Sequence, residues 1–170
     1  MILEVHRNIS LIQLPLCAIL ISMIKILFVC HGNICRSPMA EFVMKELVRR
    51  AGREKDFLIE SAATSREEIG NDIHYGTRAK LKEMGIPFTR RAARQITNAD
   101  YDKYDYLVAM DDENEYYMNR WWAPDSEHKI VRLLSFAGKS RDIADPWYTG
   151  NFDQTYDDIL EGCTAFLKVI

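Results

Sequence analysis

Short apolar runs alternate with amphipathic helical patterns from residue 24 to the C-terminus. The runs predict buried strands at Ile24–Val29, Phe57–Ala62, Tyr106–Met110 and Lys129–Leu134. The helical spacing of apolar residues predicts helices from Pro38 to Gly52, over Thr77–Met84, over Asp112–Trp121 and from about Phe152. Strands that alternate with helices imply right-handed crossovers. We therefore predict a single doubly wound α/β domain, with a four-stranded parallel sheet flanked by helices on both faces.

Residues 1–22 do not follow this pattern. Ile9–Ile21 is mostly apolar, but polar residues interrupt it and it is shorter than the roughly 20 residues of a membrane span. A signal peptide is the alternative, although no clear cleavage site precedes Met23. Met23 is followed at once by the first strand. We expect residues 1–22 to be an extension outside the catalytic fold, and residues 23–170 to form the catalytic domain.

The turn after the first strand has the features of a phosphate-binding loop. It reads Cys30-His31-Gly32-Asn33-Ile34-Cys35-Arg36-Ser37-Pro38. Ser37 is predicted as the N-cap of the next helix and Pro38 as its first residue, so that free N–H groups point back into the loop. A thiol at a helix N-terminus beside an arginine is favoured as a thiolate, which makes Cys30 a candidate nucleophile.

The other loop residues suit the binding of an anion. Gly32 and Asn33 tolerate the positive φ angles that direct successive N–H groups at one anion. Arg36 supplies a planar guanidinium that grips two phosphate oxygens and neutralises charge on a transferring phosphoryl group. Together these residues predict nucleophilic phosphoryl transfer.

These residues also carry a resemblance to a known family. Cys30-x-Gly32-Asn33-x-Cys35-Arg36-Ser37 resembles the signature of the low-molecular-weight protein tyrosine phosphatases. Further matches follow in chain order at Ser61-Ala62-Ala63-Thr64-Ser65, Ala93–Thr97, Met110-Asp111 and Asp145-Pro146-Trp147-Tyr148. The resemblance runs from Met23 to the C-terminus. It implies a flavodoxin-like, or Rossmann-like, fold and the hydrolysis of phosphotyrosine.

The resemblance also implies roles for individual residues. Cys30 forms a phosphocysteine, Arg36 binds the phosphate, and Asp145 is the general acid and then the base for the hydrolytic water. Trp147 and Tyr148 wall a slot for an aromatic ring. The remaining residues expected at the phosphate are His31, Gly32, Asn33, Ile34, Cys35 and Ser37.

Further residues are expected around this centre. Ser61, with Asn33 and Ser37, resembles the polar support that shapes the loop in similar enzymes, and Asp111 is expected to contact it from a strand end. Cys35 either captures an oxidised Cys30 as a disulfide or is a small packed thiol.

The chain departs from the family pattern at a few positions. Glu67 stands where many relatives have an aromatic residue on the pocket wall, and it is expected to repel acidic substrates. Met84 stands where some relatives have a histidine; with Ala79 and Leu81 it is predicted to be buried. The arginines at 90, 91 and 94 are interpreted as a solvated basic face.

Composition narrows the cellular context. With 48% hydrophobic and 28% charged residues the chain is typical of globular proteins, and its net charge of −3 predicts no binding of nucleic acid or an anionic membrane. Four cysteines, two of them in the loop, do not resemble a disulfide framework, so we predict a reducing cytoplasm. No metal or cofactor is expected. The expected partners are phosphotyrosine proteins and a cognate tyrosine kinase.

Three alternatives remain open. A protein arginine phosphatase would use the same scaffold, but its members tend to have threonine where this chain has Ile34. A thiol-dependent arsenate reductase needs further cysteines, and none lies between Cys35 and Cys163. A non-catalytic phosphate- or phosphopeptide-binding module would not need a thiol, an arginine and an acid together.

Overall fold

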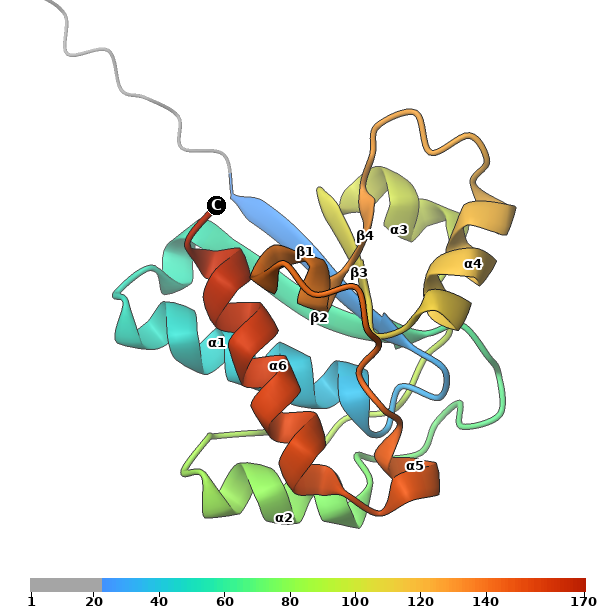
Figure 1. Ribbon diagram of the computed structural model, residues 1–170. Coiled ribbons are helices and arrows are strands. Elements are labelled where there is room, and N and C mark those ends of the chain that lie inside the picture. Colours follow the sequence, from blue (N-terminus) through green and yellow to red (C-terminus); the bar gives the residue numbers. More distant parts are fainter. Residues whose placement is uncertain (1–22) are drawn as a thin grey trace, which may run out of the picture.

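The computed structural model describes residues 23–170. At its centre lies a four-stranded parallel sheet with strand order β2-β1-β3-β4 (Figure 1). The strands are β1 (Ile24–Cys30), β2 (Phe57–Ala63), β3 (Tyr106–Ala109) and β4 (Ile130–Arg132). All three strand pairs are parallel. The predicted fold class is therefore confirmed, while the predicted extension at residues 1–22 lies outside the described residues.

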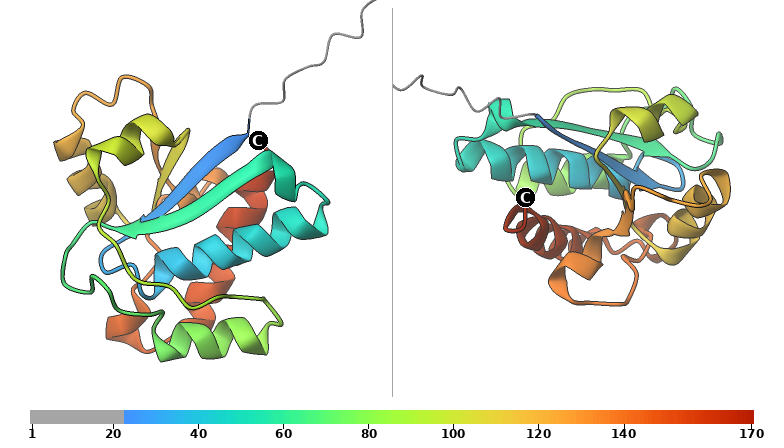
Figure 2. Two further views of the ribbon diagram at one scale, coloured as in Figure 1. Left: turned by 180° about the vertical axis from the view of Figure 1, so that it is seen from behind. Right: turned by 90° about the horizontal axis from the view of Figure 1, so that it is seen from above.

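Helices cover both faces of the sheet (Figure 2). Helices α1 (Arg36–Arg50) and α6 (Phe152–Leu167) pack together on one face, and α3 (Asn98–Lys103) and α4 (Asp112–Trp121) lie on the other. Alternate residues of β1 enter the two cores. Ile26 and Phe28 join the core beneath α1 and α6, whereas Leu27 and Val29 join the core beneath α3 and α4. This double burial explains why β1 is a continuous apolar run from Ile26 to Cys30.

The remaining elements are short and lie at the edges. Helix α2 (Tyr75–Glu83) packs against α1 and α6, and α5 (Pro146–Thr149) precedes α6. Two 3₁₀ helices, η1 (Glu54–Asp56) and η2 (Leu133–Ala137), precede β2 and follow β4. None of the helices within residues 23–170 is long and apolar enough to cross a membrane.

The strand order sets the position of the loop that follows β1. The chain passes from β1 to β2 on one side and then returns to β3 on the other side of β1. Ligands bind to doubly wound sheets at such a reversal, beyond the carboxyl ends of the strands. Residues 31–35 lie at this point, between the end of β1 and the start of α1.

Several predicted boundaries differ from the observed ones. Helix α1 begins at Arg36, so Ser37 is inside the first turn and is not the N-cap, and Pro38 is not the first helical residue. Cys35 occupies the cap position without a side-chain hydrogen bond. Ser37 instead turns its hydroxyl toward Cys30. A short polar side chain can serve either position, which is why the sequence pattern did not separate them.

The predicted bounds of α2 and β4 also differ from the observed ones. Helix α2 begins at Tyr75 rather than Thr77, so its buried face contains Gly76, Thr77, Lys80 and Leu81. Of the predicted buried positions, Leu81 is confirmed, whereas Ala79 and Met84 are exposed. The chain leaves β4 after Arg132 and enters η2, which shortens the predicted strand Lys129–Leu134 at both ends.

Candidate active site

Cys30 ends β1 with its sulfur held among hydrogen-bond donors. The backbone N–H of Asn33 donates to the Sγ atom of Cys30 at 3.3 Å, and the hydroxyl oxygen of Ser37 lies 3.1 Å from the same sulfur. Asn33 has a φ of 58°, as predicted for a residue that turns its N–H into the loop. An anionic sulfur is stabilised by such contacts. Cys30 also lines a pocket.

Gly32 is needed for a different reason from the one predicted. It is not among the residues with positive φ. A Cβ atom on Gly32 would lie 3.1 Å from the Cγ atom of Glu68. The loop and the segment after β2 therefore approach each other closely at this glycine.

Asn33 is the centre of the network that holds the loop. Its amide nitrogen donates to the hydroxyl oxygens of Ser37 and Ser61, each at 2.9 Å. Its amide oxygen accepts hydrogen bonds from the Arg91 guanidinium at 2.7 Å and from the Arg94 backbone N–H at 3.2 Å. Asn33 and Ser37 are buried behind the loop and do not line the pocket.

Arg91 and Glu41 complete this network, and sequence reasoning missed both. Arg91 donates to the Ser61 hydroxyl at 2.5 Å, and that hydroxyl donates to the carboxylate of Glu41 at 2.6 Å. The prediction of a solvated basic face is therefore wrong for Arg91, which is largely buried, and right for Arg90, which is 91% exposed on its side chain. Nothing in the run of arginines indicates which one turns inward. Arg94 pairs instead with Asp100, at 2.9 Å.

Arg36 lies beside the sulfur with its guanidinium held by two carboxylates. It donates to Asp145 Oδ2 at 2.6 Å, to the Ile143 carbonyl at 3.1 Å, and to Asp111. Burial lowers the pKa of Arg36, but the negative charges of Cys30, Asp145 and Asp111 outweigh burial and raise it. The guanidinium is therefore a permanent cation. Its buried Nε–H has no hydrogen-bond partner within residues 23–170.

Each of the two carboxylates also fixes a helix start. Asp111 Oδ1 accepts the N–H of Asn114 at 2.7 Å and caps α4, so the predicted contact of Asp111 extends to Arg36 itself. Asp145 Oδ1 accepts the N–H of Trp147 at 3.0 Å and caps α5. One carboxylate oxygen of Asp145 thus accepts a hydrogen bond from α5, and the other accepts one from Arg36.

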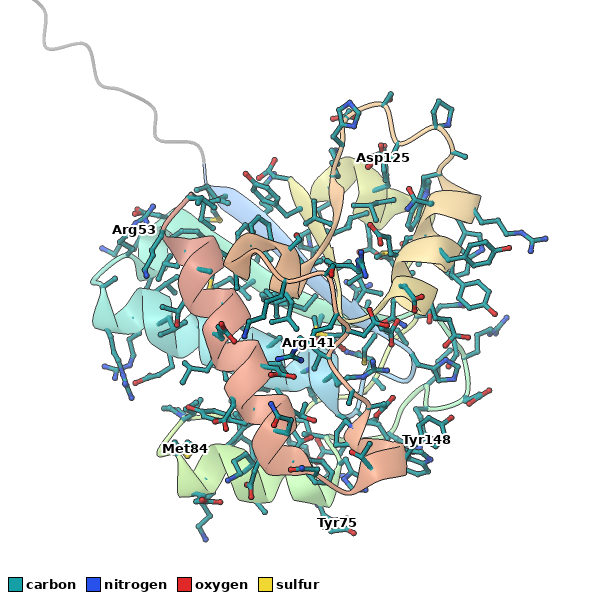
Figure 3. The ribbon with its side chains drawn as sticks, in the orientation of Figure 1. Arg53, Tyr75, Met84, Asp125, Arg141 and Tyr148 are labelled. Atoms are coloured by element: carbon teal, nitrogen blue, oxygen red, sulfur yellow. The ribbon has the colours of Figure 1, made fainter. Side chains whose placement is uncertain are left out.

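The pocket above Cys30 is small, with a cavity volume of about 90 Å³. Its lining combines residues of the loop, of the segment after β2 and of α5: Cys30, His31, Gly32, Ile34, Cys35, Glu67, Glu68, Asp145, Trp147 and Tyr148. The two aromatic residues are 55% and 82% exposed, so they form an open wall. Figure 3 shows Tyr148 at the outer edge of α5. Arg36, Ser61 and Asp111 lie behind the lining.

The wall formed by Glu67 is polar. Glu67 lines the pocket and its carboxylate lies 3.1 Å from His31 Nε2. Glu68 adds a second carboxylate beside Gly32. This side of the pocket is therefore acidic, in contrast to the aromatic wall of α5.

Cys35 is a neutral thiol in this environment. Burial raises its pKa to about 12, with further contributions from the negative charges of Cys30 and Asp145. Cys35 lines the same pocket as Cys30, and both are free thiols. The disulfide between them stays a prediction. Within residues 23–170 no three His, Cys, Asp or Glu side chains are grouped closely enough to hold a metal ion.

A thiol that accepts a backbone N–H, beside a buried arginine and an aspartate at the end of an α/β sheet, is the arrangement expected of a cysteine-dependent phosphatase. Residues 25–170 match the sequence profile of the low molecular weight phosphotyrosine protein phosphatases. The chain is 41% identical over 150 residues to the low molecular weight protein-tyrosine-phosphatase YfkJ of Bacillus subtilis, covering 87% of this chain and 96% of YfkJ. The human low molecular weight phosphotyrosine protein phosphatase is 38% identical over 148 residues, covering 84% of this chain and 93% of the human one.

Solved structures agree with the sequence matches. The crystal structure of YfkJ superposes with a TM-score of 0.85, covering 88% of this chain and 95% of that one. A Drosophila arginine phosphatase superposes with a TM-score of 0.78 at 33% identity, covering 86% of this chain and 97% of that one. The chain belongs to the low molecular weight phosphotyrosine protein phosphatase family, and it is a hydrolase. Since an arginine phosphatase has the same fold, the fold alone does not select the substrate.

Proposed function

We propose that this enzyme hydrolyses phosphotyrosine in protein substrates, with Cys30 as nucleophile, Arg36 as phosphate-binding residue and Asp145 as general acid and base. The observation that carries the proposal is the convergence of these groups on one pocket. Cys30 and Asp145 both line the pocket, and the guanidinium of Arg36 is hydrogen-bonded to Asp145. Phosphoryl transfer needs a nucleophile, neutralisation of charge and a protonated leaving group, and this arrangement offers all three.

The proposed reaction has two steps. In the first, the Cys30 thiolate attacks phosphorus, the bond from phosphorus to the phenolic oxygen breaks, and Asp145 gives its proton to that oxygen. In the second, Asp145 takes a proton from water, the water oxygen attacks phosphorus, and the sulfur–phosphorus bond breaks to release inorganic phosphate. Loop N–H groups and Arg36 bind the phosphoryl oxygens throughout.

Substrate binding changes the contacts of Arg36. One of its N–H donors holds Asp145, and its buried Nε–H has no partner within residues 23–170. A buried donor without a partner costs roughly 1–3 kcal/mol, so an arriving phosphate oxygen gains from bonding to it. The phosphate also competes with Asp145 for the guanidinium. We propose that this competition releases the carboxyl group of Asp145 toward the leaving oxygen.

The shape of the pocket supports an aromatic substrate. Trp147 and Tyr148 form one wall, and Ile34 adds an apolar surface near Cys30. A phenyl ring gains free energy by stacking against such a wall. A phosphoserine is too short to reach the sulfur and to fill the pocket as well. The tyrosine side chain is therefore the substrate class that we propose.

Peptides that carry phosphotyrosine or phosphoarginine in the same sequence discriminate between the two phosphatase activities. We expect kcat/KM to be at least about 100-fold higher for phosphotyrosine, because Ile34 offers no hydrogen bond to the guanidinium next to the phosphate, whereas Trp147 and Tyr148 offer a wall for a phenyl ring. The release of inorganic phosphate measures the hydrolysis of both peptides. A preference for phosphoarginine would contradict the proposal. Failure to hydrolyse any aryl phosphate would favour the binding-module alternative.

We further propose that residues 23–170 are the catalytic unit. Strand β1 begins at Ile24 and the family profile matches from residue 25. A chain that begins at Met23 is expected to keep its kcat/KM for p-nitrophenyl phosphate within about twofold, because the pocket is built from residues 30–148. A large loss of activity would show that residues 1–22 contribute to the site.

We also propose a reducing cytoplasm as the location, since the mechanism needs Cys30 as a free thiol. A protein tyrosine kinase is the class of enzyme that must supply phosphotyrosine substrates, so a cognate kinase is the proposed partner. The acidic wall formed by Glu67 and Glu68 supports substrates without acidic residues beside the phosphotyrosine.

A further inference from the structure

His74 joins three segments that meet beside the pocket. The start of α2, helix α5 and the start of α6 lie together next to the loop after β1 (Figures 1 and 2). The His74 ring stacks on Phe152, with centroids 5.3 Å apart and planes at 5°, and it meets Trp147 edge to face at 5.6 Å. The His74 backbone N–H donates to the Ile34 carbonyl at 2.9 Å. One residue therefore contacts the loop, α5 and α6.

Phe152, on which the His74 ring stacks, is itself tightly packed. A Cβ atom on Gly76 would lie 2.4 Å from the Phe152 ring, so the ring is packed directly against the α2 backbone. Phe152 also packs on the small cluster of Ile34, Cys35 and Ala93. The His74 ring is thus stacked on a packed aromatic side chain and also contacts Trp147.

Trp147 in turn is bonded to the proposed acid. The N–H of Trp147 donates to Asp145 Oδ1 at 3.0 Å, in the first turn of α5. Helix α5 spans four residues, too few to hold its position by its own hydrogen bonds. Contacts from outside must therefore fix where Asp145 lies.

We propose that His74 is a positioning residue for the general acid: its ring, stacked on Phe152 and in contact with Trp147, fixes α5 so that the Asp145 carboxyl group faces the leaving oxygen. This inference rests on the proposed role of Asp145. His74 has no place in the pocket lining, so it acts through Trp147 and not on the substrate.

The imidazole also caps helix α2, and different variants can remove the capping and the aromatic contact separately. Its Nδ1 atom accepts the N–H of Gly76 at 3.2 Å and caps α2. Asparagine retains a capping oxygen but removes the ring, whereas phenylalanine retains the ring but removes the acceptor. If the ring positions the acid, His74→Asn loses the positioning of Asp145 and His74→Phe keeps it. If capping of α2 is what matters, His74→Asn keeps the activity and His74→Phe loses it.

The test compares substrates by their leaving groups. The value of kcat/KM reports the steps up to the formation of the phosphoenzyme, in which protonation matters for phenyl phosphate and much less for p-nitrophenyl phosphate. We expect His74→Asn to lower kcat/KM for phenyl phosphate by roughly tenfold and for p-nitrophenyl phosphate by less than about twofold. His74→Phe should stay close to the wild type for both.

Three outcomes would overturn the proposal: an equal loss on both substrates, a loss in His74→Phe as large as in His74→Asn, or no loss in either variant. Tyr116→Asn, which removes an exposed aromatic ring on α4, is the matched control and should leave both values unchanged. If His74→Asn fails to fold, Phe152→Leu withdraws the backing ring and should give the same selective loss. Asp145→Asn, measured in parallel, identifies a failure of the proposed acid itself.

Discussion

Cys30→Ser is expected to reduce kcat for p-nitrophenyl phosphate by at least about 10⁴-fold, to the limit of detection. The Sγ atom accepts the Asn33 N–H and lies beside the Ser37 hydroxyl, contacts that stabilise an anionic sulfur. A serine hydroxyl stays protonated at neutral pH, and the described site contains no base bonded to this position to remove its proton. Initial rates measure the loss. Acid-quenched wild-type enzyme should carry a phosphoryl group on the peptide that contains Cys30.

The matched control for this variant is Cys163→Ala. Cys163 is fully buried on the inner face of α6, and burial raises its pKa above the usual range of a thiol. Its loss should lower thermal stability slightly and leave kcat unchanged. The proposal for Cys30 would be wrong if Cys30→Ser kept substantial turnover, or if the label appeared on His31 or Cys35. Binding of phosphate by Cys30→Ser, measured calorimetrically, shows whether the loop has kept its shape.

Most of the fold and of the pocket could be predicted because local patterns encode them. A strand buried on both faces is apolar, and β1 follows that rule from Ile26 to Cys30, where every residue is buried. The residues that meet at the pocket come from segments that end strands or begin helices, where turn chemistry is visible in the sequence. Cys30, His31, Gly32, Ile34, Cys35, Asp145, Trp147 and Tyr148 were predicted at the site and do line one pocket.

The interior support could not be predicted because it depends on pairs far apart in the chain. Arg91 reaches Ser61 and Asn33 across 30 and 58 positions. Glu41 reaches Ser61 from within α1. A charged side chain is buried only where other groups pair with it and bond to it. Those groups come from distant segments, so the local sequence does not identify them. His74 was missed for the same reason, since its ring contacts residues 147 and 152 and its own neighbours carry no motif.

Asp145→Asn is expected to lower kcat/KM for phenyl phosphate by about 10² to 10³-fold, and for p-nitrophenyl phosphate by less than about tenfold. Phenolate is a poor leaving group that needs the proton of the acid, whereas nitrophenolate leaves without it. Asparagine keeps the cap on α5, because its oxygen can accept the Trp147 N–H, so α5 is not disturbed. Glu113→Gln, on the exposed surface of α4, controls for the loss of one negative charge. Equal slowing of both substrates would contradict Asp145 as the acid.

The same variant tests the competition for Arg36. In the wild type one guanidinium donor is held by Asp145 at 2.6 Å, and the carboxylate also repels an incoming phosphate. The neutral amide of asparagine removes that repulsion and weakens the competing bond, because it replaces an ion pair with a hydrogen bond to an uncharged acceptor. Inorganic phosphate should therefore inhibit Asp145→Asn at a lower concentration than the wild type, although turnover has fallen. Weaker inhibition would mean that the carboxylate helps to hold Arg36 in place for phosphate instead of competing with it.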